Sequence, residues 1–435
     1  MLNATTVNRV NWSFRQRGCP LNIELEELIR HRLDEEEQRT APPDGFPALP
    51  PIAAGRYTDP SFAALEQDHV FGSSWLFAGH TSELGRPGDY RVAELPIGPV
   101  IVIRGNDSVV RAFFNSCRHR GAPVARDTCG TAKLLICQYH SWAYDTAGQL
   151  KNVPDERDFA ELDRDDRALV ALRCEVFDGW VFVCASPDTE ALESWLGPIP
   201  DQLAELDGAS LRLIGRQVAD FTCNWKLAVH AFMEVYHIRT VHPESAALLY
   251  DSRRTSLAMF ERGHNRLTVD KKPDMAFLNQ AQGAPFDNDS VGELIRTTST
   301  SYSVFPNVTI VPDPASFPFI VAWPTGVDSC RLELTWFGTD WGGGDPPREH
   351  TERMELFETI VAQDTANLAP MQESLRSAGC PDILVGYQER LLYHFERHVD
   401  AAIGTSVPSE YRVPPVLDHL IEHPTPAPVE ASVAR

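Results

Sequence analysis

Two short motifs each place a cysteine and a histidine close together, and seventeen residues lie between them. The first is C-R-H, with Cys117 and His119 two positions apart, and the second is C-Q-Y-H, with Cys137 and His140 three positions apart. Thiolates and imidazoles are both common metal ligands, so the two pairs indicate a metal centre with two sulfur and two nitrogen ligands. The identity of that metal decides what the protein does.

Two kinds of centre fit this ligand set. Structural zinc accepts Cys2His2 ligation at similar short spacings. Zinc fingers usually pair cysteine with cysteine, however, whereas both pairs here are mixed and C-x-H is tight for two ligands of one ion. A two-iron two-sulfur cluster of the Rieske type has two cysteines on one iron and two histidines on the other. Each motif then supplies one ligand to each iron, and we predict this cluster with zinc as the alternative.

A second set of candidate ligands lies in NWKLAVHAFMEVYHIRTVH, residues 224–242. His237 and His242 are five positions apart, and Glu234 precedes His237 by three, which puts these two on one face of a predicted helix. Two histidines and one carboxylate form the facial triad of non-haem Fe(II) oxygenases, which leaves positions open for O2. Two histidines at this spacing are more often structural, so the upstream cluster motif is what favours iron.

The sequence around both motifs resembles the α subunits of aromatic-ring-hydroxylating Rieske oxygenases. The resemblance rests on C-R-H-R-G, on C-Q-Y-H-S-W-A-Y-D and on N-W-K…E-x-x-H-x4-H, and it covers most of residues 57–403. It implies four ligands for a [2Fe–2S] cluster: Cys117, His119, Cys137 and His140. It also implies three ligands for a mononuclear Fe(II): His237, His242 and Asp364.

By the same resemblance, Glu234 is the catalytic acid that bridges the two centres, joining His140 of one subunit to His237 of the next. The family more often has aspartate at this position. It also often has Glu-Asn seven and six residues before the first iron histidine, where this chain has His230 and Ala231. We expect His230 to be a buried, hydrogen-bonded histidine, with a proton-relay role as the alternative.

The third iron ligand is expected in a late helix, within residues 353–379. Asp364 is the residue that matches the family there. Acidic residues on a long helix usually face solvent. Three neighbouring glutamates are its competitors: Glu355, Glu358 and Glu373.

Size and charge narrow the function classes. The 435 residues suffice for two domains, and the net charge of -22 disfavours nucleic acid, because phosphate contacts need a basic face. No apolar run approaches the roughly 20 residues of a membrane helix, and the N-terminus lacks a signal-peptide core. We therefore expect a cytoplasmic protein without a membrane partner, whose nine cysteines are thiols or metal ligands.

Local patterns predict an α+β fold. Helix signals occur at residues 21–39, 60–71, 224–240, 348–369 and 387–403. Strand signals dominate residues 90–184, where 143–150 reads as a hairpin, and recur at 302–311 and 331–337.

By resemblance, the fold is a small all-β Rieske domain followed by a helix-grip catalytic domain with an antiparallel sheet and long helices. The polar segment 186–209 predicts the boundary between them. The expected regions are an N-terminal helix and Pro-rich linker (1–56), the Rieske domain with a preceding helix (57–190), the mononuclear iron domain (200–422) and a disordered tail (423–435).

These features predict a terminal oxygenase that hydroxylates, dihydroxylates or oxidatively dealkylates an organic substrate with O2. An aromatic substrate is the main prediction and a quaternary ammonium compound the alternative, because aromatic side chains suit both. Five aromatic residues are candidates for the substrate site: Phe232, Tyr236, Phe305, Phe319 and Trp336. An electron carrier without oxygenase chemistry and a zinc-stabilised binding module are the rivals from other classes.

The chain also indicates its partners. Its glycine run WGGGDPP (341–347) is followed by prolines rather than by a phosphate-binding helix, so NAD(P)H must be oxidised by another protein. We expect a flavin reductase, with or without a ferredoxin, and by resemblance a homotrimer, with or without a β subunit. Basic residues around the first motif predict docking of an acidic partner: Arg104, Arg111, Arg118, Arg120, Arg126 and Lys133.

Overall fold

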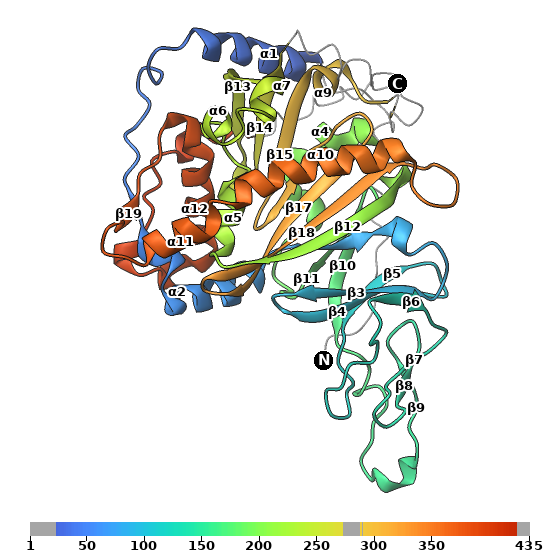
Figure 1. Ribbon diagram of the computed structural model, residues 1–435. Coiled ribbons are helices and arrows are strands. Elements are labelled where there is room, and N and C mark those ends of the chain that lie inside the picture. Colours follow the sequence, from blue (N-terminus) through green and yellow to red (C-terminus); the bar gives the residue numbers. More distant parts are fainter. Residues whose placement is uncertain (1–22, 273–287, 289, 424–435) are drawn as a thin grey trace, which may run out of the picture.

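The computed structural model describes residues 23–272, 288 and 290–423, so the predicted tail lies outside the described residues except for His423. The architecture is two seven-stranded antiparallel sheets, which follow each other along the chain, with most helices around the second (Figure 1). Within the described ranges, no helix is both long and apolar enough to cross a bilayer.

The first large sheet contains the strands predicted between residues 90 and 184. Its spatial order is β2-β11-β10-β5-β4-β3-β6. Its strands are β2 (Leu76–His80), β3 (Asp89–Leu95), β4 (Gly98–Arg104), β5 (Val110–Phe114), β6 (Cys129–Thr131), β10 (Ala171–Phe177) and β11 (Trp180–Cys184). Every residue of β2 and β11 is buried, and β11 (WVFVC) is rich in the β-branched and aromatic residues that favour strands.

A small three-stranded sheet is inserted between β6 and β10. Its strands are β7 (Leu135–Ile136), β8 (Ala143–Tyr144) and β9 (Leu150–Asn152), and β8 with β9 forms the hairpin predicted at 143–150. The insertion packs on β3, β4 and β5 around a second hydrophobic core, which includes Cys117, Cys137, Trp142 and Tyr144. Both cysteine-histidine motifs therefore lie at turns around this core.

The second large sheet has the order β12-β18-β17-β16-β15-β14-β13. Its strands are β12 (Leu211–Phe221), β13 (Tyr250–Met259), β14 (Asn265–Lys271), β15 (Thr298–Val304), β16 (Val308–Ile310), β17 (Phe317–Gly326) and β18 (Ser329–Thr339). A further two-stranded sheet pairs β1 (Ile52–Ala53) with β19 (Asp382–Ile383).

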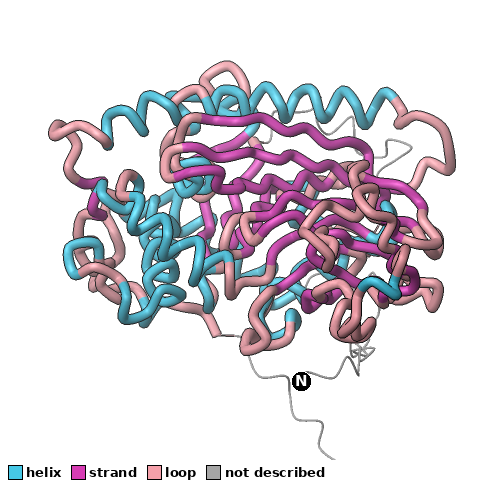
Figure 2. Tube along the Cα trace, turned by 90° about the horizontal axis from the view of Figure 1, so that it is seen from below, coloured by secondary structure: helices cyan, strands magenta, loops and turns pink. Residues whose placement is uncertain are grey.

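The longer helices lie around the second sheet (Figure 1). They are α1 (Ile23–Gln38), α10 (Arg348–Thr365), α11 (Leu368–Leu375) and α12 (Arg390–Ile403). The shorter helices are α2 (Pro60–Leu65), α3 (Leu192–Leu196), α4 (Ile199–Leu203), α5 (Trp225–His230), α6 (Ile238–Val241), α7 (Ala246–Leu249) and α9 (Glu293–Thr297). In both views a long helix crosses one face of the sheet and shorter helices gather at one end (Figure 1, Figure 2).

The segments that precede the first sheet pack on the C-terminal half of the chain. Helix α1 lies against β13, and its Ile29 and Leu33 are buried. Arg56, at the end of the predicted linker, is also buried and pairs with Glu396 (2.7 Å) and Asp400 (2.5 Å) of α12. The linker is thus anchored at its end, and the division of the chain into four regions stays a prediction.

The predicted helix over 224–240 is wrong in one respect, because it is broken into α5 and α6. Between them the carboxylate of Glu234 accepts the backbone N–H groups of Tyr236 and His237. A side chain that takes these donors competes with the i→i−4 hydrogen bonds of a continuous helix. The chain therefore turns at this point and starts a new helix at Ile238.

One other prediction also differs from the structure. The strand predicted at 302–311 is divided into β15 and β16, and Pro306 between them has no N–H to donate to a ladder. The segment 186–209, where the domain boundary is predicted, contains α3 and α4, and its leucines at 192, 196, 203 and 206 lie in the main hydrophobic core.

Candidate active site

The two cysteine-histidine loops have the same backbone fold. In each loop the cysteine N–H donates to the carbonyl oxygen five residues later, at 2.8 and 2.9 Å. The residue four positions after each cysteine donates back to its carbonyl oxygen, and these residues, Gly121 (φ 79°) and Ser141 (φ 57°), have left-handed backbone conformations. Positive φ is uncommon for a residue other than glycine, so the turn at Ser141 is a specific feature of the site.

The paired loops bring like ligands together. The thiols of Cys117 and Cys137 are in contact and buried, whereas the rings of His119 and His140 lie towards the surface with centroids 4.6 Å apart. Trp142 stacks on His119 at a centroid distance of 4.9 Å. This inner pair of sulfurs and outer pair of imidazoles matches a cluster with one iron on each pair.

The spacing of the same ligands disfavours a single zinc ion. Ligands of one zinc lie within about 4.6 Å of each other, because each is about 2.0–2.3 Å from the ion. Among the residues that the structure describes, no three ligand atoms of the two loops converge within 4.8 Å. Four donors in two separated pairs fit a two-iron cluster better than one ion.

A second centre forms where α6 meets α10. His237 and His242 flank α6, and Asp364 lies in the last turn of α10 and is buried. The Nε2 atoms of the two histidines lie 3.2 and 2.6 Å from Asp364 Oδ1. The ligand atoms of these three residues lie within 4.8 Å of one another. The structure thus brings together the three predicted iron ligands, although 122 residues separate His242 from Asp364.

This second centre favours positive charge. Burial by itself would lower the pKa of His237, but hydrogen bonds to Asp364 and Glu234 raise it to about 10. Burial also acts to lower the pKa of His242, whereas Asp364 and Gln363 raise it. Two imidazole nitrogens and a carboxylate that together stabilise a cation fit a divalent metal ion at the same point.

Two protein-family models match the chain. Residues 74–165 match the Rieske [2Fe-2S] domain, and residues 209–405 match the catalytic domain of the ring hydroxylating alpha subunit. The first range contains both cysteine-histidine loops and the second contains the triad. The chain belongs to the family of Rieske ring-hydroxylating oxygenase alpha subunits. The predicted family, the α+β fold class and the two kinds of iron cofactor are thereby confirmed.

Curated relatives match this alpha subunit over part of their length. Benzene 1,2-dioxygenase subunit alpha of Pseudomonas putida is 38% identical over 190 residues, which make up 42% of either chain. The carnitine monooxygenase oxygenase subunit of Escherichia coli K12 is 32% identical over 207 residues, which are 46% of this chain and 55% of that subunit. The matches therefore span about half of the relatives' length.

Solved structures share the fold over most of the alpha subunit. A quaternary ammonium Rieske monooxygenase superposes with a TM-score of 0.70 at 21% identity, covering 81% of this chain and 94% of the other. Naphthalene 1,2-dioxygenase superposes with a TM-score of 0.66 at 23% identity, covering 82% and 93%.

In this alpha subunit, Glu234 is the outer partner of His237. Its Oε1 atom accepts the Nδ1–H of His237, and its Oε2 atom accepts the backbone N–H of His237 at 3.2 Å. The predicted contact is present, but a turn creates it rather than a shared helical face. The Glu234 side chain keeps 12% of its surface exposed and Tyr236 beside it 61%, so this edge of the site reaches the protein surface.

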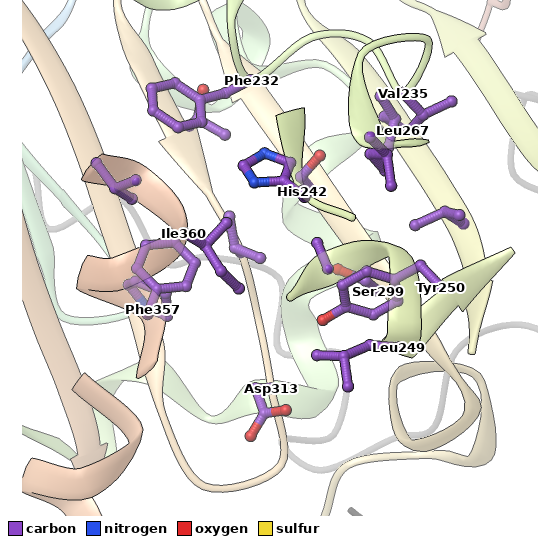
Figure 3. Close-up of a pocket in the computed structure, with 18 of the residues that line it drawn as sticks. Phe232, Val235, His242, Leu249, Tyr250, Leu267, Ser299, Asp313, Phe357 and Ile360 are labelled. Carbon is purple, nitrogen blue, oxygen red and sulfur yellow. The ribbon is translucent and has the colours of Figure 1, made fainter. Parts of the chain in front are cut away.

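A cavity of about 340 Å³ extends from the triad between the second sheet and α10. Figure 3 shows His242 at one end of it and Asp313 at the other. Phe357 and Ile360 of α10 form one wall, and Leu249 and Tyr250 lie on the opposite side. The walls near the triad are mainly apolar, as in sites that hold small organic molecules.

Most of the aromatic residues proposed for the substrate site lie elsewhere. Among the five, Phe232 lines the cavity. Tyr236 is exposed, and Phe305, Phe319 and Trp336 are buried in the main core. The sequence analysis missed Phe357, which lies two helical turns before Asp364. That spacing of seven residues is a signal that was available, because it places both side chains on one face of α10.

The competing glutamates of the predicted iron site and His230 lie outside the triad. Glu355 and Glu373 are exposed, and Glu358 is half-buried and accepts a hydrogen bond from Gln217 at 2.5 Å. His230 is buried, as predicted, and its Nε2 atom lies 3.2 Å from Glu396 Oε1. It therefore belongs to the buried charge network around Arg56 rather than to the triad.

Gln363 is a residue of the site that the sequence analysis missed. Its Oε1 atom lies 2.7 Å from His242 Nδ1 and accepts a hydrogen bond from Ser245 Oγ at 2.6 Å. The amide oxygen favours the proton of His242 on Nδ1, which leaves the Nε2 lone pair, on the side of Asp364, to bind a metal ion. Each histidine of the triad thus has its own outer partner, a carboxylate for His237 and an amide for His242.

Gln363→Leu is expected to weaken iron binding at the triad by about 10- to 100-fold, because outer partners orient metal-bound histidines. The substitution keeps the side-chain size and removes the acceptor for His242 Nδ1–H. Release of iron to a ferrous chelator measures the effect, and the visible spectrum should show an unchanged cluster. Gln217→Leu, at an exposed glutamine, is the control. Equal release rates for the two variants would contradict the role of Gln363.

Proposed function

We propose that this chain is a terminal oxygenase that oxidises an organic substrate with O2. The observation that carries the proposal is the convergence of His237, His242 and Asp364 at one end of an apolar cavity. A two-histidine, one-carboxylate site leaves coordination positions open, and here they adjoin a space that a small molecule can enter. When bound, the mononuclear iron supplies O2 activation and the cluster supplies electron transfer.

The side chains of the chain itself have defined tasks in this proposal. Cys117, Cys137, His119 and His140 hold the cluster. His237, His242 and Asp364 hold the mononuclear iron. Glu234 and Gln363 fix the two iron-binding imidazoles through their Nδ1 atoms, and the apolar walls orient the substrate and exclude water from it. Hydroxylation, dihydroxylation and oxidative dealkylation are all compatible with this arrangement, and breakdown of aromatic compounds in the cytoplasm is the role we propose.

The two centres of one chain lie far apart, which supports a homotrimer in which cluster and iron of neighbouring subunits meet. Figure 1 shows β7, β8 and β9 at the lower end of the molecule and α6 towards the opposite end. Leu134, Ile136 and Tyr139 around the cluster loops are exposed by 40%, 50% and 53%. A group of exposed apolar side chains is typical of a contact surface. We propose that this surface contacts the exposed Tyr236, beside Glu234, of the neighbouring subunit. A β subunit is compatible with this assembly.

A separate flavin reductase, with or without a ferredoxin, is the proposed electron source. Of the basic residues predicted to attract it, Arg111 pairs with Asp107 at 2.6 Å and Arg104 donates to the backbone carbonyl of Ser108 at 3.2 Å. Arg120, Arg126 and Lys133 remain exposed beside the cluster loops. They provide a smaller basic surface for an acidic partner than the sequence predicts.

Iron content and oxygen uptake test the proposal. The purified protein is expected to be coloured and to hold about three iron atoms per subunit, two in the cluster and one at the triad. With a surrogate reductase, a panel of small aromatic compounds should include some that stimulate oxygen uptake and yield a product with added oxygen. About two iron atoms and no stimulated uptake would instead indicate an electron carrier, and a colourless zinc protein would indicate a binding module.

The quaternary ammonium alternative receives less support from the cavity. Outside the iron site, the charged residues that line it are three cations, Lys271, Arg296 and Arg353, and one anion, Asp313, so the charge of the cavity disfavours a quaternary ammonium ion. We therefore retain an uncharged aromatic group as the part of the substrate nearest the iron.

A further inference from the structure

The end of the cavity remote from the triad carries a group of charged side chains. Lys271, Arg296, Arg353 and Asp313 all line it, and Asp313 marks its far end in Figure 3. Three of these residues are cations and one is an anion. Tyr250 and Ser299 lie between His242 and Asp313 in Figure 3 and add hydroxyl groups to the cavity lining.

The two arginines at this end already have partners. Arg353 pairs with Asp313 at 2.8 Å. Arg296 donates from Nε to the Val291 carbonyl oxygen and from Nη2 to that of Asn288, each at 3.0 Å. Asp313 neutralises Arg353, but backbone carbonyls do not cancel the charge of Arg296, so Arg296 adds to the positive potential at this end. Lys271 is the cation whose ammonium group keeps one of its three N–H donors for a ligand.

Lys271 is held without a neutralising carboxylate. It is the last residue of β14, and its ammonium group donates to the carbonyl oxygens of Ile295 (3.2 Å) and Arg296 (3.0 Å). An ammonium group has three N–H donors, and no carboxylate of the described residues lies within ion-pair distance of it. Burial lowers the pKa of Lys271; Asp313 acts against this, and Arg353 and Arg296 lower it further. A bound anion would therefore stabilise the positive charge of Lys271.

We infer that this site takes a substrate with an aromatic or other apolar body and a terminal carboxylate, which Lys271 binds. This rests on the proposed oxygenase function and names its substrate class. The carboxylate lies at the Lys271 end, and the apolar body extends along Phe357 and Ile360 towards His242. Such a molecule is oxidised on its ring or chain end, away from the carbon beside the carboxylate. Arenes without a charged group leave Lys271 without its counter-ion.

Binding of matched ligands tests the inference without turnover. The probes are ω-phenylalkanoates with one to five methylene groups, the primary amides of the same chain lengths, and the corresponding phenylalkyl-trimethylammonium ions. Titration calorimetry on the iron-loaded enzyme without O2 is expected to show the best acid binding about 10- to 100-fold more tightly than its amide, because a hydrogen bond to a charged group is stronger than a neutral one. The trimethylammonium ions should bind more weakly than the amides.

Two lysine variants identify the group responsible. Lys271→Gln should abolish the preference for acid over amide while the amide binds as before. Lys272→Gln is the matched control, because this adjacent lysine is exposed and donates to the Ala247 carbonyl oxygen at 2.5 Å. Thermal unfolding of both variants separates the ligand effect from loss of the carbonyl contacts. If Lys271→Gln does not fold, Lys271→Arg, which keeps the positive charge, should retain the acid preference, and the wild-type comparison of acid and amide still decides whether the site takes a carboxylate.

The outcomes distinguish this inference from the proposed function. Equal binding of acids and amides by the wild-type enzyme, tighter binding of the cations, or an unchanged acid preference in Lys271→Gln would each overturn it. Oxygen uptake is measured separately with the same compounds. Acid-selective binding without any oxygen uptake would leave the carboxylate site standing and reject the oxygenase. Oxygen uptake with uncharged arenes, together with equal binding of acids and amides, would support the oxygenase and reject the carboxylate site.

Discussion

Asp364→Ala is expected to remove the mononuclear iron while leaving the cluster intact. Asp364 supplies the carboxylate on which both triad histidines converge, so its loss leaves two imidazoles without an anionic ligand. Iron should fall by about one atom per subunit, and turnover by more than about 100-fold, because a direct ligand matters more than an outer partner. The visible spectrum should stay that of the wild type, since the cluster loops belong to a different sheet.

Glu355→Ala is the control for this prediction. Glu355 lies on the same helix as Asp364, but it is exposed. Its replacement should leave the iron content, spectrum and turnover at wild-type values. An Asp364→Ala protein that retained all its iron and its activity would mean that another side chain is the third ligand.

Glu234→Gln is expected to disconnect the two metal centres while both remain occupied. Glu234 uses Oε1 for His237 Nδ1–H and Oε2 for the backbone N–H groups of Tyr236 and His237. A glutamine has one acceptor and one donor end, so whichever way it turns, its NH2 group faces an N–H donor. The contact with His237, or the one that starts α6, is therefore lost. Product formation should fall by about 10- to 100-fold or more.

A single turnover measures this effect directly. Pre-reduced enzyme is mixed with substrate and O2, and cluster oxidation is followed at the same time as product. The variant should have its cluster reduced at a near-normal rate beforehand, hold both metals and give little product. Rapid cluster oxidation with a normal product yield would reject the bridging role. Loss of iron or of the assembled protein would instead show that Glu234 acts mainly by shaping the turn before α6.

The sequence alone determined the parts of the site that are built from one short stretch of chain. The C-R-H and C-Q-Y-H loops and the E-x-x-H-x4-H segment are each held by turns within a few residues, so their spacing already specifies which side chains lie together. The family resemblance named Asp364 as well. The α+β class followed from strand signals and helical periodicity, which are local properties.

Other features depended on contacts between distant segments. Gln363 reaches His242 across 121 positions, and Arg56 reaches Glu396 across 340. Long-range packing brings such pairs together, and no local pattern records it.

The cavity is the clearest example of a feature that the sequence pattern could not predict. Its walls are formed by residues of β13 to β17 and α10. Phe357 therefore lines the cavity, whereas Phe319 and Trp336, which are also aromatic, are buried in the main core. Lys271 and Lys272 are adjacent and chemically identical, yet one lines the cavity and the other is exposed. Residue type, spacing and the family resemblance indicated which metals this protein binds, because six of the seven expected ligands lie in two short stretches, residues 117–140 and 237–242. The tertiary structure decided what lies around the substrate, because a cavity exists only between elements that have packed.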